Sequence, residues 1–115
     1  MIKISIAEDN IISLRALEEK LSVYEEIVII HAANNGTELL DLLAENSEID
    51  LILMDIEMPF MNGIEATGII KQKYPHIKIV MITIYDDDEH IFNAIRAGAD
   101  SYILKETKAE KIYET

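Results

Sequence analysis

The segment Leu51-Ile52-Leu53-Met54-Asp55 is the key to the architecture of this chain. Four consecutive apolar residues indicate a strand that is buried on both faces, as the strands of parallel sheets are. Pro59 cannot donate to a sheet ladder, which predicts that the strand ends before it. Asp55 therefore stands at the carboxyl end of an interior strand, where open α/β sheets bind their ligands.

On either side of this segment, strand and helix patterns alternate along the whole chain. Strands are expected over residues 2–7, 27–30, 51–55, 78–83 and 101–104, with helices between them and a fifth helix from residue 108. The alternation and the short connections predict an α/β fold, a doubly wound five-stranded parallel sheet in one domain.

Individual residues predict where the helices begin and end. Asn10 and Thr37 are expected to cap the first two helices. Gly98 is expected to end the fourth helix. Gly68, inside the third helix, is expected to destabilise it by up to about 1 kcal/mol relative to Ala.

Composition narrows the possible functions. Half of the 115 residues are hydrophobic, none is cysteine, and 22 acidic against 10 basic residues give a net charge of −12. This charge opposes direct binding of nucleic acid and suits divalent cations or a basic partner. No signal peptide is visible, and no apolar run approaches the ~20 residues of a membrane span, so we expect a cytoplasmic protein that does not insert into membranes.

Polar residues end or directly follow four of the five expected strands. They are Glu8 and Asp9, then Asp55, Thr83 and Lys105. The carboxyl ends of parallel strands meet at one edge of a sheet, and grouped carboxylates repel one another unless a cation lies among them. Oxygen ligands without His or Cys favour Mg²⁺, with Mn²⁺ as a second possibility.

This set of residues suits phosphoryl transfer. Asp55 is the expected nucleophile, while Lys105 and Thr83 would contact the phosphoryl oxygens. The sequence contains no glycine-rich phosphate loop, so the donor must come from elsewhere. Each residue alone also has a structural interpretation, as a cap, a turn residue, a strand residue or a surface charge, and only their conjunction indicates function.

The sequence resembles the receiver domain of bacterial two-component response regulators. The resemblance rests on residues 6–9, 53–59 with Asn62-Gly63, the strand ending at Thr83, and residues 97–105. Residues 63–66 and 94–99 are most similar to the NarL/FixJ-like (LuxR-type) subclass. The resemblance implies a flavodoxin-like (CheY-like) (βα)5 fold over residues 1–115. It also implies a truncated last helix and a C-terminal output domain that this chain lacks.

The resemblance also implies roles for individual residues. Asp55 would accept a phosphoryl group from a sensor histidine kinase, and Lys105 would pair with that group. Mg²⁺ would be held by Asp9, Asp55 and the main-chain carbonyl of Glu57, with Glu8 in support. Thr83 and Tyr102 would form a conformational switch.

Such a domain is a signalling module and not an enzyme. It would control its own output domain, expected to bind DNA and regulate transcription, and a homodimer is possible. One departure from the family is Ile84, where a small residue is usual, so we expect slower transfer from small donors. Glu57 and Tyr85 are the other residues expected to modulate access to Asp55.

Two other functions fit parts of the sequence. One is a receiver-fold module that binds partners without accepting phosphate. The other is a phosphatase with an aspartate nucleophile, which Asp55-Ile56-Glu57 superficially suggests.

Overall fold

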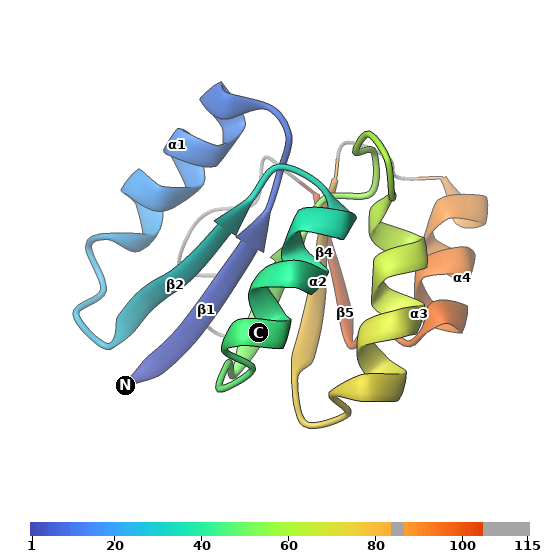
Figure 1. The fold of residues 1–115 in the computed structure, drawn as a ribbon. Helices are drawn as coiled ribbons and strands as arrows, with labels where there is room; N and C mark the ends of the chain where they lie inside the picture. The colour runs from blue at the N-terminus through green and yellow to red at the C-terminus, as the bar shows by residue number, and fades with distance from the viewer. Residues whose placement is uncertain (84–86, 105–115) are drawn as a thin grey trace.

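The computed structural model describes residues 1–83 and 87–104 of the chain (Figure 1). The elements follow in the order β1 (Ile2–Ala7), α1 (Ile11–Leu21), β2 (Ile27–Ala33), α2 (Gly36–Glu45), β3 (Leu51–Met54), α3 (Gly63–Lys73), β4 (Lys78–Thr83), α4 (Asp88–Ala97) and β5 (Ser101–Leu104). The fifth helix expected from residue 108 lies outside the described residues.

All five strands form one parallel sheet in the order β2-β1-β3-β4-β5. The apolar strand β3 is central, between β1 and β4. Figure 1 shows α2, α3 and α4 side by side on one face of the sheet and α1 on the other. The predicted doubly wound α/β fold is thereby confirmed, and its strand order is the flavodoxin-like one.

The apolar residues divide into one core on each face of the sheet. Leu39 and Leu43 of α2, Ile70 of α3 and Ala94 of α4 pack against one face. Leu14 and Leu21 of α1 pack against the other. β3 supplies side chains to both cores, which explains its unbroken apolar sequence. Within the described part of the chain, no helix has the length and apolar character that a membrane span requires.

Side-chain caps begin each described helix. Asn10 accepts from the backbone N–H groups of Ile12 and Ser13, which confirms its predicted role. The prediction of Thr37 as the second cap is wrong. Asn35 is the cap and accepts from Glu38 N–H, because the helix begins at Gly36, before Thr37.

Strand β2 is three residues longer than predicted. His31, Ala32 and Ala33 continue it beyond Ile30. Tertiary pairing explains the difference, because the last residues of β1 lie beside them in register and Glu8 N–H donates to the Ala33 carbonyl at 2.9 Å. The C-terminal end of α4 agrees with the prediction, with Gly98 as a left-handed cap at φ 113°.

An ion pair joins α3 to the loop before β5. Lys71 Nζ lies 2.8 Å from Asp100 Oδ2 and also donates to the Ile77 carbonyl at 2.8 Å. Asp100 Oδ2 accepts a further hydrogen bond from Ile79 N–H at 2.8 Å. Burial by itself would raise the pKa of Asp100, but the hydrogen bonds from Lys71 and Ile79 and the positive charges of Lys71 and Lys78 outweigh it and lower that pKa.

Replacing Asp100 by Asn is expected to lower the free energy of unfolding by about 1 kcal/mol at pH 7, a modest value because the carboxylate is partly exposed. The folded-state pKa is depressed, so the stabilisation is present above the ordinary value of about 4 and is lost as pH falls through the folded-state pKa. Urea unfolding of both proteins should therefore show a difference at neutral pH that shrinks progressively as pH falls below about 4. Glu48→Gln is the control, because its pair with Lys3 is 3.5 Å long and highly exposed.

Candidate functional site

Three carboxylates converge at the carboxyl edge of the sheet. Glu8 and Asp9 follow β1, and Asp55 follows β3, the strand beside it. Asp55 N–H donates to the Ala7 carbonyl at 3.0 Å, so the two strand ends are aligned. One carboxylate oxygen from each residue lies within 4.8 Å of the others. The predicted grouping of these three acids is confirmed.

Backbone contacts hold two of the carboxylates in place. Asn10 N–H donates to Glu8 Oε2 at 3.1 Å, and Ile56 N–H donates to Asp55 Oδ1 at 2.9 Å. Glu8 and Asp55 are 2% and 7% exposed, whereas Asp9 is exposed. The cluster therefore has a buried floor and one carboxylate at its opening toward solvent.

The donor set fits a hard divalent cation. Negative charges this close raise one another's energy, and burial of two of them adds a desolvation penalty that a cation relieves. All the side-chain donors are carboxylate oxygens, the ligands that Mg²⁺ prefers. Among residues 1–83 and 87–104, this is the one group of three or more acidic, His or Cys residues with such spacing.

The two ends of the loop from Asp55 to Gly63 lie close together. Gly63 N–H donates to the Ile56 carbonyl at 2.8 Å, and Asn62 caps α3 by accepting from Glu65 N–H. A Cβ atom on Gly63 would lie 2.0 Å from the Asp55 carbonyl oxygen. Gly63 is thus required by close backbone approach beside Asp55.

Thr83 and Tyr102 lie on neighbouring strands. Thr83 ends β4 and is fully buried. Tyr102 pairs in register with Met81, two residues before Thr83, so both predicted switch residues are on the same face of the sheet. Tyr102 is half-buried and packs against the core beneath α3 and α4.

The remaining predicted site residues are only partly described. Glu57 lies two residues after Asp55 with an exposed side chain, and the role of its main-chain carbonyl stays a prediction. Ile84, Tyr85 and Lys105 lie outside the described residues.

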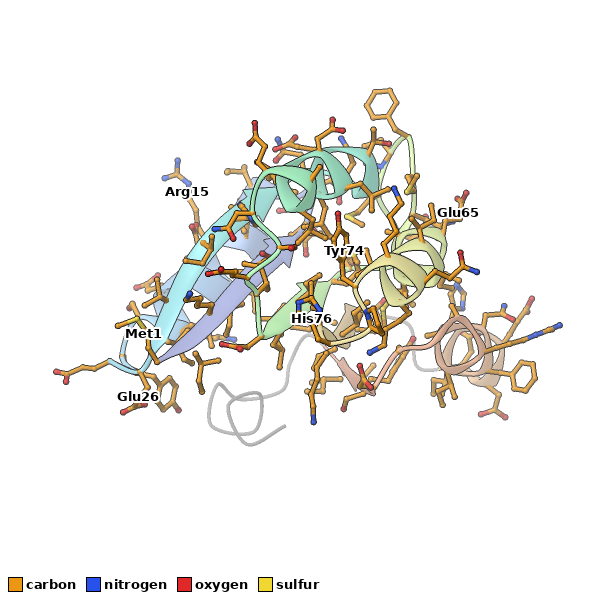
Figure 2. The ribbon with its side chains drawn as sticks, turned by 60° about the horizontal axis from the view of Figure 1, so that its bottom comes forward. Met1, Arg15, Glu26, Glu65, Tyr74 and His76 are labelled. Carbon is orange, nitrogen blue, oxygen red and sulfur yellow. The ribbon has the colours of Figure 1, made fainter. Side chains whose placement is uncertain are left out.

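The opposite edge of the sheet, at the amino-terminal ends of the strands, carries a histidine contact and a lysine–glutamate ion pair. Figure 2 brings that edge forward, with Met1, Glu26 and His76 labelled. His76 Nε2 contacts the Ser47 carbonyl at 3.1 Å, and Lys3 pairs with Glu48. The first contact joins the loop before β4 to the loop before β3, and the second joins β1 to that same loop before β3. The described carboxylate cluster is at the other edge.

Comparison with known protein families gives one match over most of the chain. The family model for the response regulator receiver domain matches residues 4–115. The chain is 39% identical over 112 residues to the transcriptional regulatory protein LnrK of Bacillus subtilis, covering 97% of this chain and 50% of LnrK. It is 36% identical over 113 residues to the response regulator protein VraR of Staphylococcus saprophyticus, covering 98% of this chain and 54% of VraR. The chain therefore spans about half the length of these relatives.

Solved structures agree over nearly the whole chain. A DNA-binding response regulator of the LuxR family from Staphylococcus aureus superposes with a TM-score of 0.91 at 27% identity, covering 99% of this chain and 94% of that one. The response regulator domain of CheB from Thermotoga maritima gives a TM-score of 0.88 at 25% identity, covering 99% and 92%. The LuxR-type likeness predicted from the sequence is confirmed.

Proposed function

Because this chain belongs to the response regulator receiver domain family, we propose that it accepts a phosphoryl group on Asp55 with the help of Mg²⁺. The observation that supports this most directly is the convergence of Glu8, Asp9 and Asp55, whose oxygens lie within 4.8 Å of one another. An isolated Asp55 would be an unremarkable turn residue, but beside two further acids it is part of a cation site.

Asp9 and Asp55 would hold the metal ion directly, with the Glu57 carbonyl as a further ligand and Glu8 in support. When bound, Mg²⁺ would neutralise the cluster and the phosphoryl oxygens that approach it. The exposed position of Asp9 suits a ligand that the ion meets on entry, and the buried Glu8 suits a fixed counter-charge beneath it.

Asp55 would act as the nucleophile. One of its carboxylate oxygens forms a bond to phosphorus while the P–N bond of a phosphohistidine donor breaks, and the imidazole nitrogen keeps the electron pair. The hydrogen bond from Ile56 N–H restrains the Asp55 carboxylate, so less orientation is needed at the moment of transfer. Lys105 and Thr83 would then contact the phosphoryl oxygens.

The response would be a shift between two conformations. The buried Thr83 hydroxyl would bond to the phosphoryl group, and the half-buried Tyr102 on the next strand would move toward the vacated space. Moving a domain from mostly inactive to mostly active requires the phosphoryl group to favour one state by about 5 kcal/mol. Charge-assisted hydrogen bonds to the phosphoryl oxygens would supply much of that difference.

The partners follow from the same role. We infer that a sensor histidine kinase supplies the phosphoryl group. Relatives of about twice this length are named transcriptional regulatory proteins, which supports control of a C-terminal output domain that regulates transcription. A homodimer of the receiver would be compatible with the same role.

Acetyl phosphate with Mg²⁺, read by intact-protein mass, tests the proposal. The parent should gain one base-labile phosphoryl group and should require the metal. Asp9→Asn removes one of three carboxylate donors and is expected to slow labelling at least about 10-fold at limiting Mg²⁺, because the loss of even an outer partner of a metal ligand costs that much. Asp41→Asn, at an exposed acid of α2, is the matched control and should label at the parental rate.

The same experiment separates the two alternatives. A module that binds partners without phosphate would gain no adduct. A phosphatase would release phosphate from unrelated esters over many turnovers. Either result would overturn the receiver function.

A further inference from the structure

Phe60 is an aromatic residue with an unusual conformation and almost no packing. It lies in the loop between β3 and α3, and its side chain is 90% exposed. Its φ of 67° is the one positive φ of a non-glycine residue within the described part of the chain. A bulky residue with positive φ has a strained backbone, and strained residues of this kind cluster at functional sites.

A hydrogen bond between the two residues that flank Phe60 fixes its strained backbone conformation. Met61 N–H donates to the Pro59 carbonyl at 2.7 Å, which closes a three-residue γ-turn around Phe60. With positive φ at its centre, this is the rarer and more strained form of the γ-turn. The exposed ring makes too few contacts to offset that strain in the free domain.

The turn is held firmly on both sides. The Met61 carbonyl accepts from Gly36 N–H at 3.1 Å, and the Met61 side chain is so close to Gly36 that a Cβ there would lie 2.9 Å from Met61 Cγ. The Gly63 to Ile56 hydrogen bond closes the loop from the other end. The backbone of Phe60 is therefore held in place, and little backbone entropy remains to be lost when a partner buries the ring.

The place of Phe60 identifies what would cover it. It follows Asp55 by five residues in the same closed loop. A small donor such as acetyl phosphate has no surface against which the ring could pack. A protein that brings a phosphohistidine to Asp55 must lie over this edge of the sheet, and exposed aromatic rings are frequent anchors of such contacts.

We propose that Phe60 is the anchor by which the protein phosphodonor docks, its ring entering an apolar pocket beside the donor histidine. This inference rests on the proposed function and adds to it a residue that selects protein donors over small ones. An uncharged anchor also allows docking beside a carboxylate cluster without relying on attraction between opposite charges.

Three substitutions distinguish the effect of the aromatic ring from the effect of the strained backbone. Phe60→Ala removes the ring and keeps a side chain in the strained turn, Phe60→Gly removes both, and Phe60→Tyr keeps both. The probe is a ³²P-labelled histidine kinase core, found by testing all purified kinase cores of the source genome for transfer to the parent. Each variant is compared for kcat/KM of transfer from this kinase, for labelling by acetyl phosphate, and for Tm.

We expect Phe60→Ala and Phe60→Gly to lose about 30-fold in kcat/KM from the kinase, as loss of an anchor does, while acetyl phosphate labels both at the parental rate. Only Phe60→Gly should raise Tm, by about 2–4 °C, because glycine adopts positive φ without strain. Phe60→Tyr should transfer like the parent. Phe92→Ala, at an exposed Phe of α4, is the matched control and should also transfer like the parent.

Other results would overturn the anchor. Parental transfer from the kinase to Phe60→Ala, with normal acetyl phosphate labelling, would refute the inference and leave the receiver function standing. No labelling of the parent by acetyl phosphate or by any kinase would remove both. Concentration-dependent dimers of the parent that Phe60→Ala abolishes, with equal kinase transfer, would assign the ring to a second copy of this chain instead.

Discussion

Replacing Asp55 by Asn is expected to abolish the phosphorylated form completely. The amide has nearly the same shape as the carboxylate but lacks the nucleophilic oxygen that forms an acyl phosphate. Intact mass after incubation with acetyl phosphate and Mg²⁺ should show the unmodified protein alone. An adduct of parental yield would mean that another group accepts phosphate, and peptide mapping would identify it.

The same substitution should not damage the fold. In metal-free buffer it removes one of three negative charges whose oxygens lie within 4.8 Å of one another, so it relieves repulsion. The free energy of unfolding, measured in urea with EDTA, is expected to stay level or to rise by up to about 1 kcal/mol. A large loss of stability would instead show that Asp55 is a structural residue, which would weaken the case for a cation site.

The fold could be predicted because its signals are local and agree with one another. The apolar residues 51–54 specify a strand buried on both faces, and both cores indeed contain side chains of β3. The acidic cluster followed from topology, since residues after β1 and β3 must meet once the strands are parallel neighbours. Neither inference required knowledge of side-chain packing.

What the sequence analysis missed depends on contacts between distant segments. Strand β2 extends to Ala33 because β1 is there to pair with it, although His31-Ala32-Ala33 has little strand character of its own. The left-handed φ of Phe60 arises from a loop held at both ends, by Gly36 and by Ile56. No short-range pattern in the sequence indicates either constraint, and a Phe gives no sign of positive φ.

Gly63→Ala is expected to destabilise the domain by about 3 kcal/mol and to disable the site. The added Cβ would lie 2.0 Å from the Asp55 carbonyl oxygen and 2.9 Å from Met54 Cγ. Backbone contacts of this kind cannot be relieved by turning a flexible side chain, so the start of α3 or the end of β3 must move. Urea unfolding measures the loss of stability, and Mg²⁺ titration of the folded variant measures the effect on the site.

Mg²⁺ binding should be affected because the carbonyl oxygen that the added Cβ would meet belongs to Asp55 itself. A shift of its carbonyl moves the side chain away from Glu8 and Asp9, so Mg²⁺ affinity should fall even where the variant remains folded. Gly68→Ala is the matched control, since a Cβ at Gly68 meets nothing within 4 Å and lies inside α3. It should raise stability by up to about 1 kcal/mol and leave Mg²⁺ binding unchanged. Equal stability of the two variants would show that the loop yields easily, and then the geometry of Asp55 would not depend on Gly63.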